Sequence, residues 1–429
     1  MSFLARHIYS LLLWLLLPIV WGRLLWRSIK NPKYQQRWAE RLGYVSKENA
    51  GYDIWIHAVS MGEATAAIPL VQELMRTYPE IRIYITTMTP SGSDRINSAF
   101  GNTIGHSYAP YDYTFAVTRF VNQVRPKLLV LIETEIWPNT IYACWKRNIP
   151  IVMLNVRLSE KSLRKYQRIT WLLKQTLGYI AQFGVQSYTH QTRLIALGVD
   201  QSVIKKTGSM KFEVKLTAGV REVAEAVRQD WGRDRLIIVA GSTHEGEEEI
   251  LLRVYLQLKI RFTELLMVVA PRHPERFDSV FKLTSKMNLR ATRRSEQQGS
   301  LPHGLDILIA DTLGELPILY SAADIAFVGG SLLQGLGGHN ILEPCAVSVP
   351  VVFGPVMPNF REISQIAIDS QAGVQVHSQN DLETQLSTLL DDPNLRATMG
   401  ENGVKMVAKN AGAIELSMNI LSPLIGKSK

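Results

Sequence analysis

A carboxylate at the start of a helix is the first candidate for chemistry in this chain. Residues 54–63 read IWIHAVSMGE, where alternating apolar residues lead to a turn of small residues and then to Glu63. An Ala-rich run with helical spacing follows, so the stretch predicts strand, tight turn and helix. Open α/β sheets bind ligands at the carboxyl ends of their strands, which is where this turn lies. The helix dipole favours negative charge at the helix start, so Glu63 is expected to be ionised near neutral pH and able to accept a proton. Alternatively, Glu63 only stabilises the helix N-terminus.

Two further carboxylates, Glu133 and Glu135, follow the most apolar predicted strand of the first half, in the sequence IETEIWP over residues 132–138. Carboxylates at the end of a buried strand cost desolvation energy unless something pairs with them. One of them can be catalytic and the other a structural anchor, or both can be structural. The sequence does not separate Glu133 from Glu135.

The second half of the chain carries polar residues after successive predicted strands. They are Gly241–His244, Pro271–Pro274, Asp311–Glu315 and Gly329–Ser331. A glycine-rich stretch, GLGGHNILEP over residues 335–344, comes next. Glycines allow close approach to a phosphate, a helix entered at Asn340 offers free N–H groups to an anion, and Glu343 can accept hydrogen bonds from a ribose diol. This half therefore predicts a ligand site.

Two series of alternating strands and helices position these residues. The strands predicted for the first half are 53–59, 81–87, 127–132, 151–154 and 180–185, and those for the second half are 236–240, 265–270, 306–309, 325–328, 351–353 and 374–376. Such alternation indicates parallel sheets covered by helices. We expect an α/β protein of two Rossmann-like domains facing a cleft. The polar residues 290–300 are predicted to form a surface loop or hairpin.

Composition narrows the function. The chain has 429 residues, a formal net charge of +9 and two cysteines, Cys144 and Cys345. The charge suggests an acidic ligand or a membrane surface, and the cysteines are expected to be buried thiols. No phosphate-loop, dinucleotide or zinc-spacing motif and no Asp-x-Asp occurs. A nucleic-acid partner is not expected, because no aromatic and basic binding module is visible.

The N-terminus predicts a membrane anchor. Residues 8–21, IYSLLLWLLLPIVW, form an uncharged run. This run is shorter than a membrane-spanning helix, which needs about 20 residues. The basic residues that follow place the body of the protein on the cytoplasmic side, whether the run spans the bilayer or lies in its interface; they are Arg23, Arg27, Lys30, Lys33, Arg37 and Arg41. The alternative is a soluble protein whose first helix packs on its own core.

Several stretches together closely resemble the Kdo transferases of Gram-negative bacteria. They are HAVSMGE (57–63), ETEIWPN (133–139), GSMKFE (208–213), GSTHEGEEE (241–249), APRHPERF (270–277), DTLGEL (311–316) and GGHNILEP (337–344). The resemblance implies a GT-B glycosyltransferase that moves 3-deoxy-D-manno-octulosonic acid (Kdo) from CMP-Kdo to the lipid A precursor (lipid IVA) in lipopolysaccharide biosynthesis, at the inner membrane. It also implies an anchor with its basic segment over residues 1–34, an acceptor domain over 35–210 and a CMP-Kdo domain over 211–429.

The resemblance carries roles to individual residues. Glu63 would be the general base of an inverting transfer, while Glu133 and Lys211 would stabilise the transition state. The CMP contacts would come from Pro271, Arg272, His273, Thr312, Leu313, Gly314, Gly338, His339, Asn340, Ile341 and Glu343. No metal or other cofactor is expected, since a single departing phosphate can be held by cations and helix N-termini. The number of Kdo units added and the oligomeric state stay open.

Two alternatives remain. The chain can be another GT-B sugar transferase or a nucleotide-sugar epimerase of the same architecture, because a fold does not fix a function. It can also be a catalytically inactive, membrane-docked nucleotide-binding protein. The presence of Glu63, both carboxylates of ETEIWP and Lys211 argues against the inactive protein.

Overall fold

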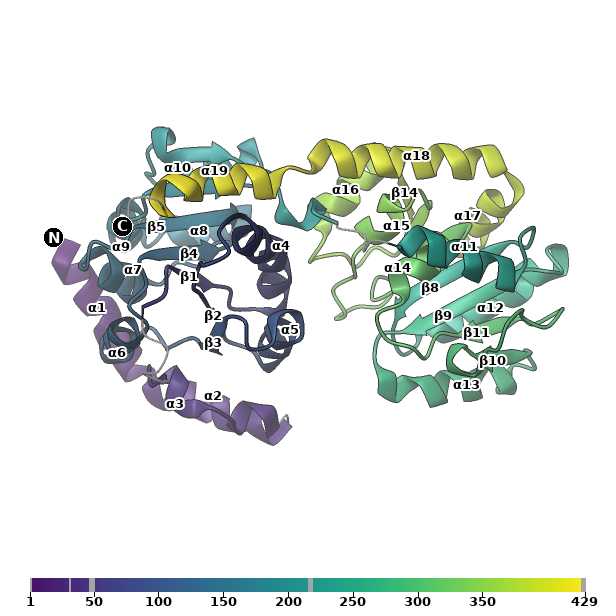
Figure 1. Ribbon diagram of the computed structural model, residues 1–429, viewed down its shortest axis with the longest axis horizontal. Helices are drawn as coiled ribbons and strands as arrows, with labels where there is room; N and C mark the ends of the chain where they lie inside the picture. The colour runs from purple at the N-terminus through teal and green to yellow at the C-terminus, as the bar shows by residue number, and fades with distance from the viewer. Residues whose placement is uncertain (1, 31, 46–50, 215–218, 426–429) are drawn as a thin grey trace. The chain divides into compact units, whose positions relative to one another are not determined.

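Two parallel sheets organise the chain. The computed structural model describes residues 2–30, 32–45, 51–214 and 219–425 (Figure 1). Residue contacts divide it into a first unit, Met1–Glu213 with Ala411–Lys429, and a second unit, Val214–Asn410. Each unit holds one seven-stranded sheet, so the predicted pair of Rossmann-like domains is present.

The first sheet has the strand order β3-β2-β1-β4-β5-β6-β7, and all of its strands are parallel. The strands are β1 Ile54–His57, β2 Ile83–Thr87, β3 Gly105–Tyr108, β4 Leu128–Ile132, β5 Ile151–Val156, β6 Gln182–Val185 and β7 Ile204–Lys206. The strand order reverses between β1 and β4, which makes this the switch point where such sheets bind ligands. The sequence did not predict β3 and β7, because each is a short edge strand with few apolar residues.

Helices cover both faces of this sheet. They are α4 Met61–Thr77, α5 Pro90–Phe100, α6 Thr114–Val124, α7 Pro138–Trp145, α8 Glu160–Gln167, α9 Thr170–Gly178 and α10 Tyr188–Ala196. Side chains alternate along β1, so Ile54 and Ile56 join the core under α4 while Trp55 joins the core under α6. The turn after β1 is thereby fixed from both faces.

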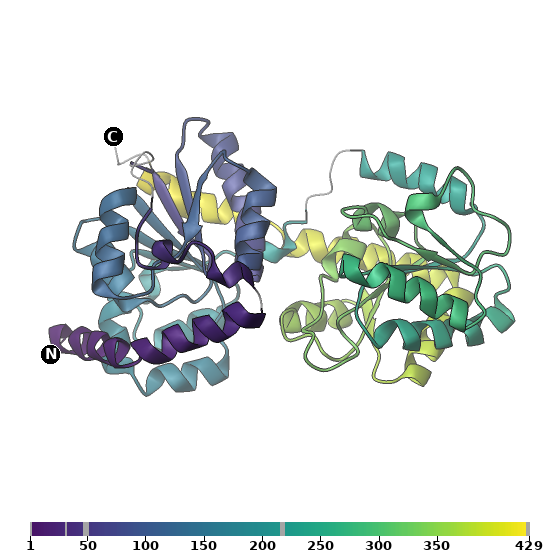
Figure 2. The ribbon, with the colours of Figure 1, turned by 90° about the horizontal axis from the view of Figure 1, so that it is seen from below.

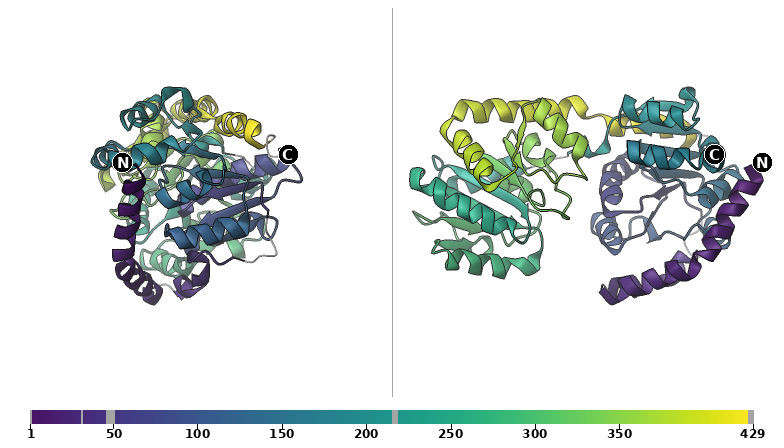
Figure 3. Two further views of the ribbon diagram at one scale, coloured as in Figure 1. Left: turned by 90° about the vertical axis from the view of Figure 1, so that its left-hand side faces the viewer. Right: turned by 180° about the vertical axis from the view of Figure 1, so that it is seen from behind.

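The N-terminal segment lies along one side of the first unit (Figures 2 and 3). It comprises α1 Ser2–Leu15, α2 Leu17–Lys30, η1 Pro32–Gln35 and α3 Trp38–Arg41. Within the described residues no single helix is long and apolar enough to cross a bilayer, although the pair Ala5–Leu15 and Leu17–Ile29, bent by 49°, has the length and composition to do so.

The second sheet repeats the pattern, with the order β10-β11-β9-β8-β12-β13-β14 and parallel strands. The strands are β8 Ile237–Thr243, β9 Leu266–Pro271, β10 Ala291–Arg293, β11 Ile307–Ile309, β12 Ile325–Val328, β13 Val351–Phe353 and β14 Gly373–Gln375. Its switch point lies between β8 and β12. Part of the stretch predicted as a surface loop or hairpin, Ala291–Arg293, is instead an edge strand of this sheet. It was missed because it is short and polar.

The helices of the second unit are α11 Val220–Trp231, α12 Glu247–Arg261, α13 Phe277–Lys286, α14 Leu316–Ser321, α15 Leu342–Ala346, α16 Arg361–Asp369, α17 Gln379–Asp391 and α18 Pro393–Asn410. Further short 3-10 helices occur in both units. Those of the first unit are η3 Gln201–Val203 and η4 Met210–Phe212, and those of the second are η5 Pro274–Arg276 and η6 Arg294–Glu296. The helix predicted to be entered at Asn340 begins at Leu342.

The last helix, α19 Ala413–Ile425, belongs to the first unit rather than to the second, where residues 211–429 were expected. Its apolar side chains Ile414, Met418 and Leu421 join the core beneath α4. The Glu213 carboxylate accepts the N–H groups of Gly412 at 2.8 Å and Ile414 at 3.3 Å, which holds the start of α19. Burial of this apolar face explains why the chain returns to the first unit (Figure 1).

Candidate active site

Glu63 lies in the first turn of α4 and is almost fully buried. Ser60 caps the helix by accepting the Glu63 N–H at 3.2 Å, and its hydroxyl lies 2.7 Å from Oε1 of Glu63. Oε2 accepts the Val59 N–H at 2.8 Å, so the carboxylate also fastens the turn. Burial, together with the nearby charge of Glu135, raises the pKa of Glu63 to about 8. The expectation that Glu63 is ionised near neutral pH is therefore wrong, because burial outweighs the helix dipole.

Glu133 and Glu135 differ in ways that the sequence did not show. Glu133 has a φ of 63°, a strained left-handed backbone for a residue with a side chain. Its carboxylate has no hydrogen bond to any part of the chain that the structure describes. Glu135 accepts a hydrogen bond from the Trp137 indole at 2.5 Å, and burial raises its pKa to about 7. Glu135 is thus held in place, while Glu133 is available.

These three carboxylates form one electrostatic group at the switch point of the first sheet. The charges of Glu135 and Glu133 both raise the pKa of Glu63, and Glu133 also raises that of Glu135. Carboxylates whose charges interact in this way titrate as a coupled group. Perturbed carboxylates at a strand edge are typical of an acid or base site.

His57, at the end of β1, also belongs to this edge, although its local sequence does not predict a role for it. Its ring is buried, its Nδ1 lies 2.9 Å from the Thr86 hydroxyl, and its Nε2 has no hydrogen-bond partner among the residues that the structure describes. Burial lowers the pKa of His57 to about 3, so the ring is neutral. The Trp137 ring meets it edge-on, with centroids 5.2 Å apart. In the sequence, only the residue type and its place at the end of a predicted strand could have pointed to His57.

Lys211 lies on η4, which packs against α4, the helix that carries Glu63. The buried Asn155 orders this segment. It has a φ of 57°, and its Oδ1 accepts the Met210 N–H at 3.1 Å and the Gln186 amide at 2.9 Å. Asn155 thus connects the end of β5 to the segment that bears Lys211.

The candidate nucleotide residues of the second unit follow adjacent strands of its sheet. Pro271 ends β9 and is followed by the exposed Arg272 and His273, whereas Thr312–Gly314 lie between β11 and α14. The Thr312 hydroxyl donates to Glu315. Leu313 is 75% exposed, so its side chain is open to a ligand.

Glu247, a fully buried carboxylate at the start of α12, fixes the loop at the second switch point. Its Oε2 accepts the N–H groups of His244 at 3.0 Å and Gly330 at 2.7 Å. Its Oε1 accepts those of Ser331 and Leu332, both at 2.9 Å. One carboxylate thereby joins the end of β8 to the loop after β12.

The glycine-rich loop lies against this anchor. The Gly338 N–H donates to the Gly330 carbonyl at 2.7 Å, and a Cβ at Gly338 would lie 2.3 Å from the Met357 sulfur. The His339 and His244 rings have nearly parallel planes and meet through their Nε2 atoms, 2.8 Å apart, and His273 meets His244 edge-on. The Asn340 amide donates to Glu343 at 3.1 Å, whereas Ile341 is buried, so only its backbone can meet a ligand.

Cys144 and Cys345 are free and buried, as expected. Among the described residues no cluster of three His, Cys, Asp or Glu side chains could hold a metal ion.

Comparison with known proteins places this geometry in context. The family profile described as 3-deoxy-D-manno-octulosonic-acid transferase (kdotransferase) matches residues 36–214, and that described as glycosyl transferases group 1 matches residues 286–406. The 3-deoxy-D-manno-octulosonic acid transferase of Haemophilus influenzae is 37% identical over 427 residues, which cover 99% of each chain.

Two solved structures share the fold. UDP-GlcNAc 2-epimerase from Neisseria meningitidis, bound to UDP-GlcNAc, is 14% identical, with a TM-score of 0.58 over 86% of this chain and 99% of its own. A glycosyltransferase from Rickettsia africae is 15% identical, with a TM-score of 0.57 over 88% of this chain and 99% of its own. At these identities the likeness establishes the fold alone, the two Rossmann-like domains of the GT-B class.

Proposed function

Because the chain belongs to the 3-deoxy-D-manno-octulosonic acid transferase family, we propose that it transfers Kdo from CMP-Kdo to the lipid A precursor, lipid IVA, with inversion at the anomeric carbon. The observation that carries the mechanism is the coupled group of Glu63, Glu135 and Glu133 at the switch point of the first sheet. A group of this kind can take a proton from an attacking sugar hydroxyl.

In the proposed reaction Glu63 is the general base. Its bonds to Ser60 and the Val59 N–H aim the carboxylate, and its raised pKa makes it a stronger base once its proton has left. The acceptor hydroxyl gives its proton to Glu63 as its oxygen bonds to the anomeric carbon of Kdo and the bond to the CMP phosphate breaks.

The charges that develop in this step need partners. Positive charge at the anomeric carbon favours a nearby carboxylate, for which Glu133 is suited, since its carboxylate has no hydrogen bond within the described residues. Negative charge on the departing CMP favours an ammonium group, the role we assign to Lys211. Glu135 is held by Trp137, and its charge raises the pKa of Glu63.

The second unit is the proposed donor domain. Arg272 and the N–H groups of the glycine-rich loop suit the phosphate of CMP, and Glu343 suits the ribose. Buried Glu247 supports this assignment, because it prearranges the loop through four backbone hydrogen bonds.

We also propose that the first unit docks on the cytoplasmic face of the inner membrane. Polar contacts hold α1 to the unit: Tyr9 donates to Asp112 at 3.0 Å, and Ser10 to Asn139 at 3.1 Å. Large apolar side chains of α1, α2 and the turn between them stay exposed: Leu11, Leu12, Trp14, Leu15, Leu16, Ile19, Leu25, Trp26 and Ile29. Such a surface suits an interfacial helix pair.

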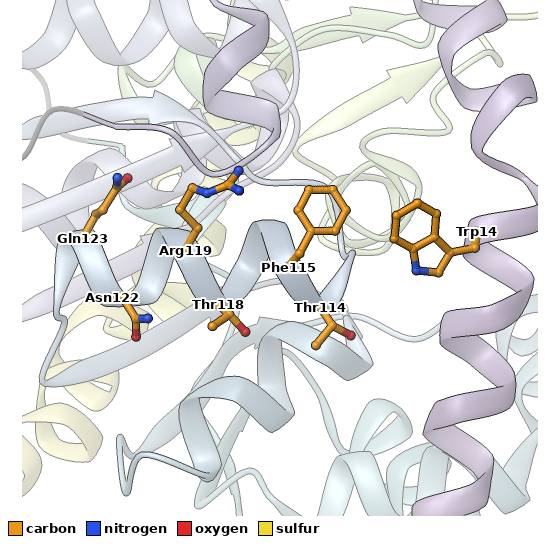
Figure 4. A pocket seen from close by; sticks show the side chains of 7 residues that line it. All are labelled: Trp14, Thr114, Phe115, Thr118, Arg119, Asn122 and Gln123. Carbon is orange, nitrogen blue, oxygen red and sulfur yellow. The ribbon is translucent and has the colours of Figure 1, made fainter.

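A hollow of about 640 Å³ opens between α1 and α6 (Figure 4). Trp14 and Phe115 both line it and are in contact, with ring centroids 5.6 Å apart, and the Arg119 guanidinium lies farther along α6. Aromatic side chains next to a cation are common at membrane interfaces, which supports docking of this side of the unit.

The test uses purified full-length protein, CMP-Kdo and the lipid A precursor, with the product's mass as the readout. We expect Kdo addition, and a Glu63→Gln variant that binds CMP normally but transfers about 10² to 10⁴ times more slowly. Turnover of a UDP-sugar and none of CMP-Kdo would instead support the epimerase or another sugar transferase. Normal transfer by Glu63→Gln would remove Glu63 as the base.

A further inference from the structure

A basic face on α8 lies beside the carboxylate group and has no part in the mechanism above. It lines a hollow of about 490 Å³ with Lys161, Arg164, Lys165 and Arg168, together with Glu160. The spacing of these four cations places them along one side of the helix. All of them are exposed, whereas Leu163 and Tyr166 of the same helix pack against the core. The cations are therefore not needed to hold α8 on the sheet.

The charge of this face is largely uncompensated. Glu160 pairs with Arg164, which lowers the pKa of the Glu160 carboxyl. For Lys161, Lys165 and Arg168, the described part of the chain supplies no carboxylate. Cations this close on a helix repel one another, so a bound dianion would relieve the repulsion.

Contacts connect α8 to the site. The Thr134 hydroxyl, between Glu133 and Glu135, donates to the Arg157 carbonyl at 2.7 Å, just before the helix begins. Tyr166 is close enough to Glu135 for that charge to act on it, although burial is the main reason that its pKa is raised. An anion on this face would thus be held near Glu135, whose charge acts in turn on Glu63, the proposed base.

We propose that this face binds a phosphate monoester carried by the glycolipid acceptor and thereby presents the acceptor hydroxyl to Glu63. The proposal rests on the proposed function, because it assigns part of the acceptor site of that reaction. The cations supply affinity for the acceptor and take no part in the bond changes.

The test compares a double variant, Lys161→Gln with Lys165→Gln, with wild type in neutral-detergent micelles, where anionic phospholipid is absent. We expect the KM for the phosphorylated acceptor to rise by about tenfold, while kcat and the KM for CMP-Kdo stay unchanged. With acceptor dephosphorylated by alkaline phosphatase, variant and wild type should have the same KM. The matched control, Lys146→Gln with Lys174→Gln, removes two exposed lysines of the same unit and should behave as wild type.

Three results would overturn the proposal. The first is an unchanged acceptor KM in the double variant, and the second is a rise that persists with dephosphorylated acceptor. The third concerns vesicles of phosphatidylethanolamine and phosphatidylglycerol that contain no acceptor. If the double variant lost as much binding to these vesicles as to the acceptor, the face would be assigned to bilayer phospholipid. Direct binding of the phosphorylated acceptor, measured by fluorescence in detergent, tests the face even if the wild type does not transfer Kdo. A wild type that binds the acceptor on this face but does not transfer Kdo would count against the proposed function alone.

Discussion

The imidazole rings of His244 and His339 meet edge to edge, with 2° between their planes and their Nε2 atoms 2.8 Å apart. One Nε2 must donate and the other must accept, so this bond needs at least one neutral ring. The pair joins the end of β8 to the glycine-rich loop at the second switch point. Its protonation state therefore bears on the shape of the proposed donor site.

We predict that acid weakens the second unit through this pair. Burial lowers the pKa of His339 from 6.5 to about 4. Between these values the unfolded chain binds more protons than the folded chain, so the free energy of unfolding falls as the pH is lowered, by up to about 3 kcal/mol for a shift of this size. Urea unfolding from pH 7 to 4.5 measures the slope. His339→Gln should make the slope shallower, whereas the exposed-site control His303→Gln should not; equal slopes would contradict the prediction.

We predict that Glu135 sets the pH dependence of catalysis. Glu63 must lose its proton to act as a base, so kcat/KM should rise with pH toward a plateau above about 8, the raised pKa of Glu63. Glu135→Gln keeps an oxygen to accept the Trp137 hydrogen bond but removes the charge, which should move the midpoint to lower pH. Rate profiles of both proteins provide the measurement. A midpoint that does not move would show that Glu135 has no such influence.

We predict that Glu247→Gln disrupts the donor domain. The new amide nitrogen replaces one carboxylate oxygen and cannot accept N–H groups, so one buried and one partly buried N–H group lose their partner at a cost of about 3 kcal/mol. Chemical unfolding and CMP affinity should both report the loss. Glu249→Gln is the matched control on the same helix, since its exposed pair with Arg253 contributes little. If the two variants proved equally stable, Glu247 would not be the anchor described above.

We predict that Tyr9→Phe loosens α1 from the first unit. The hydroxyl of Tyr9 is one of several donors to buried Asp112, alongside the N–H and hydroxyl of Thr140 at 2.7 Å. Its removal should cost about 1 to 2 kcal/mol and raise the hydrogen-exchange rate of the α1 amides in detergent. Tyr44→Phe removes an exposed hydroxyl elsewhere in the unit and serves as the control. Unchanged α1 exchange in Tyr9→Phe would count against the tether.

The fold was largely predictable because hydrophobic periodicity records which strands are buried. Strands such as β4 and β12, buried on both faces, have continuous apolar runs that mark them in the sequence. The short edge strands β3, β7 and β10 lack that signal. The return of α19 to the first unit was not visible either, because an apolar helix face does not reveal which core it joins.

The sequence by itself determined the candidate residues, the pair of Rossmann-like domains and, through the resemblance of whole motifs, the family. Only the tertiary structure decided how those residues differ in chemistry. It buries Glu63 beside Glu135, so that desolvation raises a pKa that the helix dipole alone would lower. It also places Glu133 in a strained backbone and makes buried Glu247 the anchor of a loop more than 80 residues away. Burial and long-range contacts set these properties, and neither is encoded in local spacing.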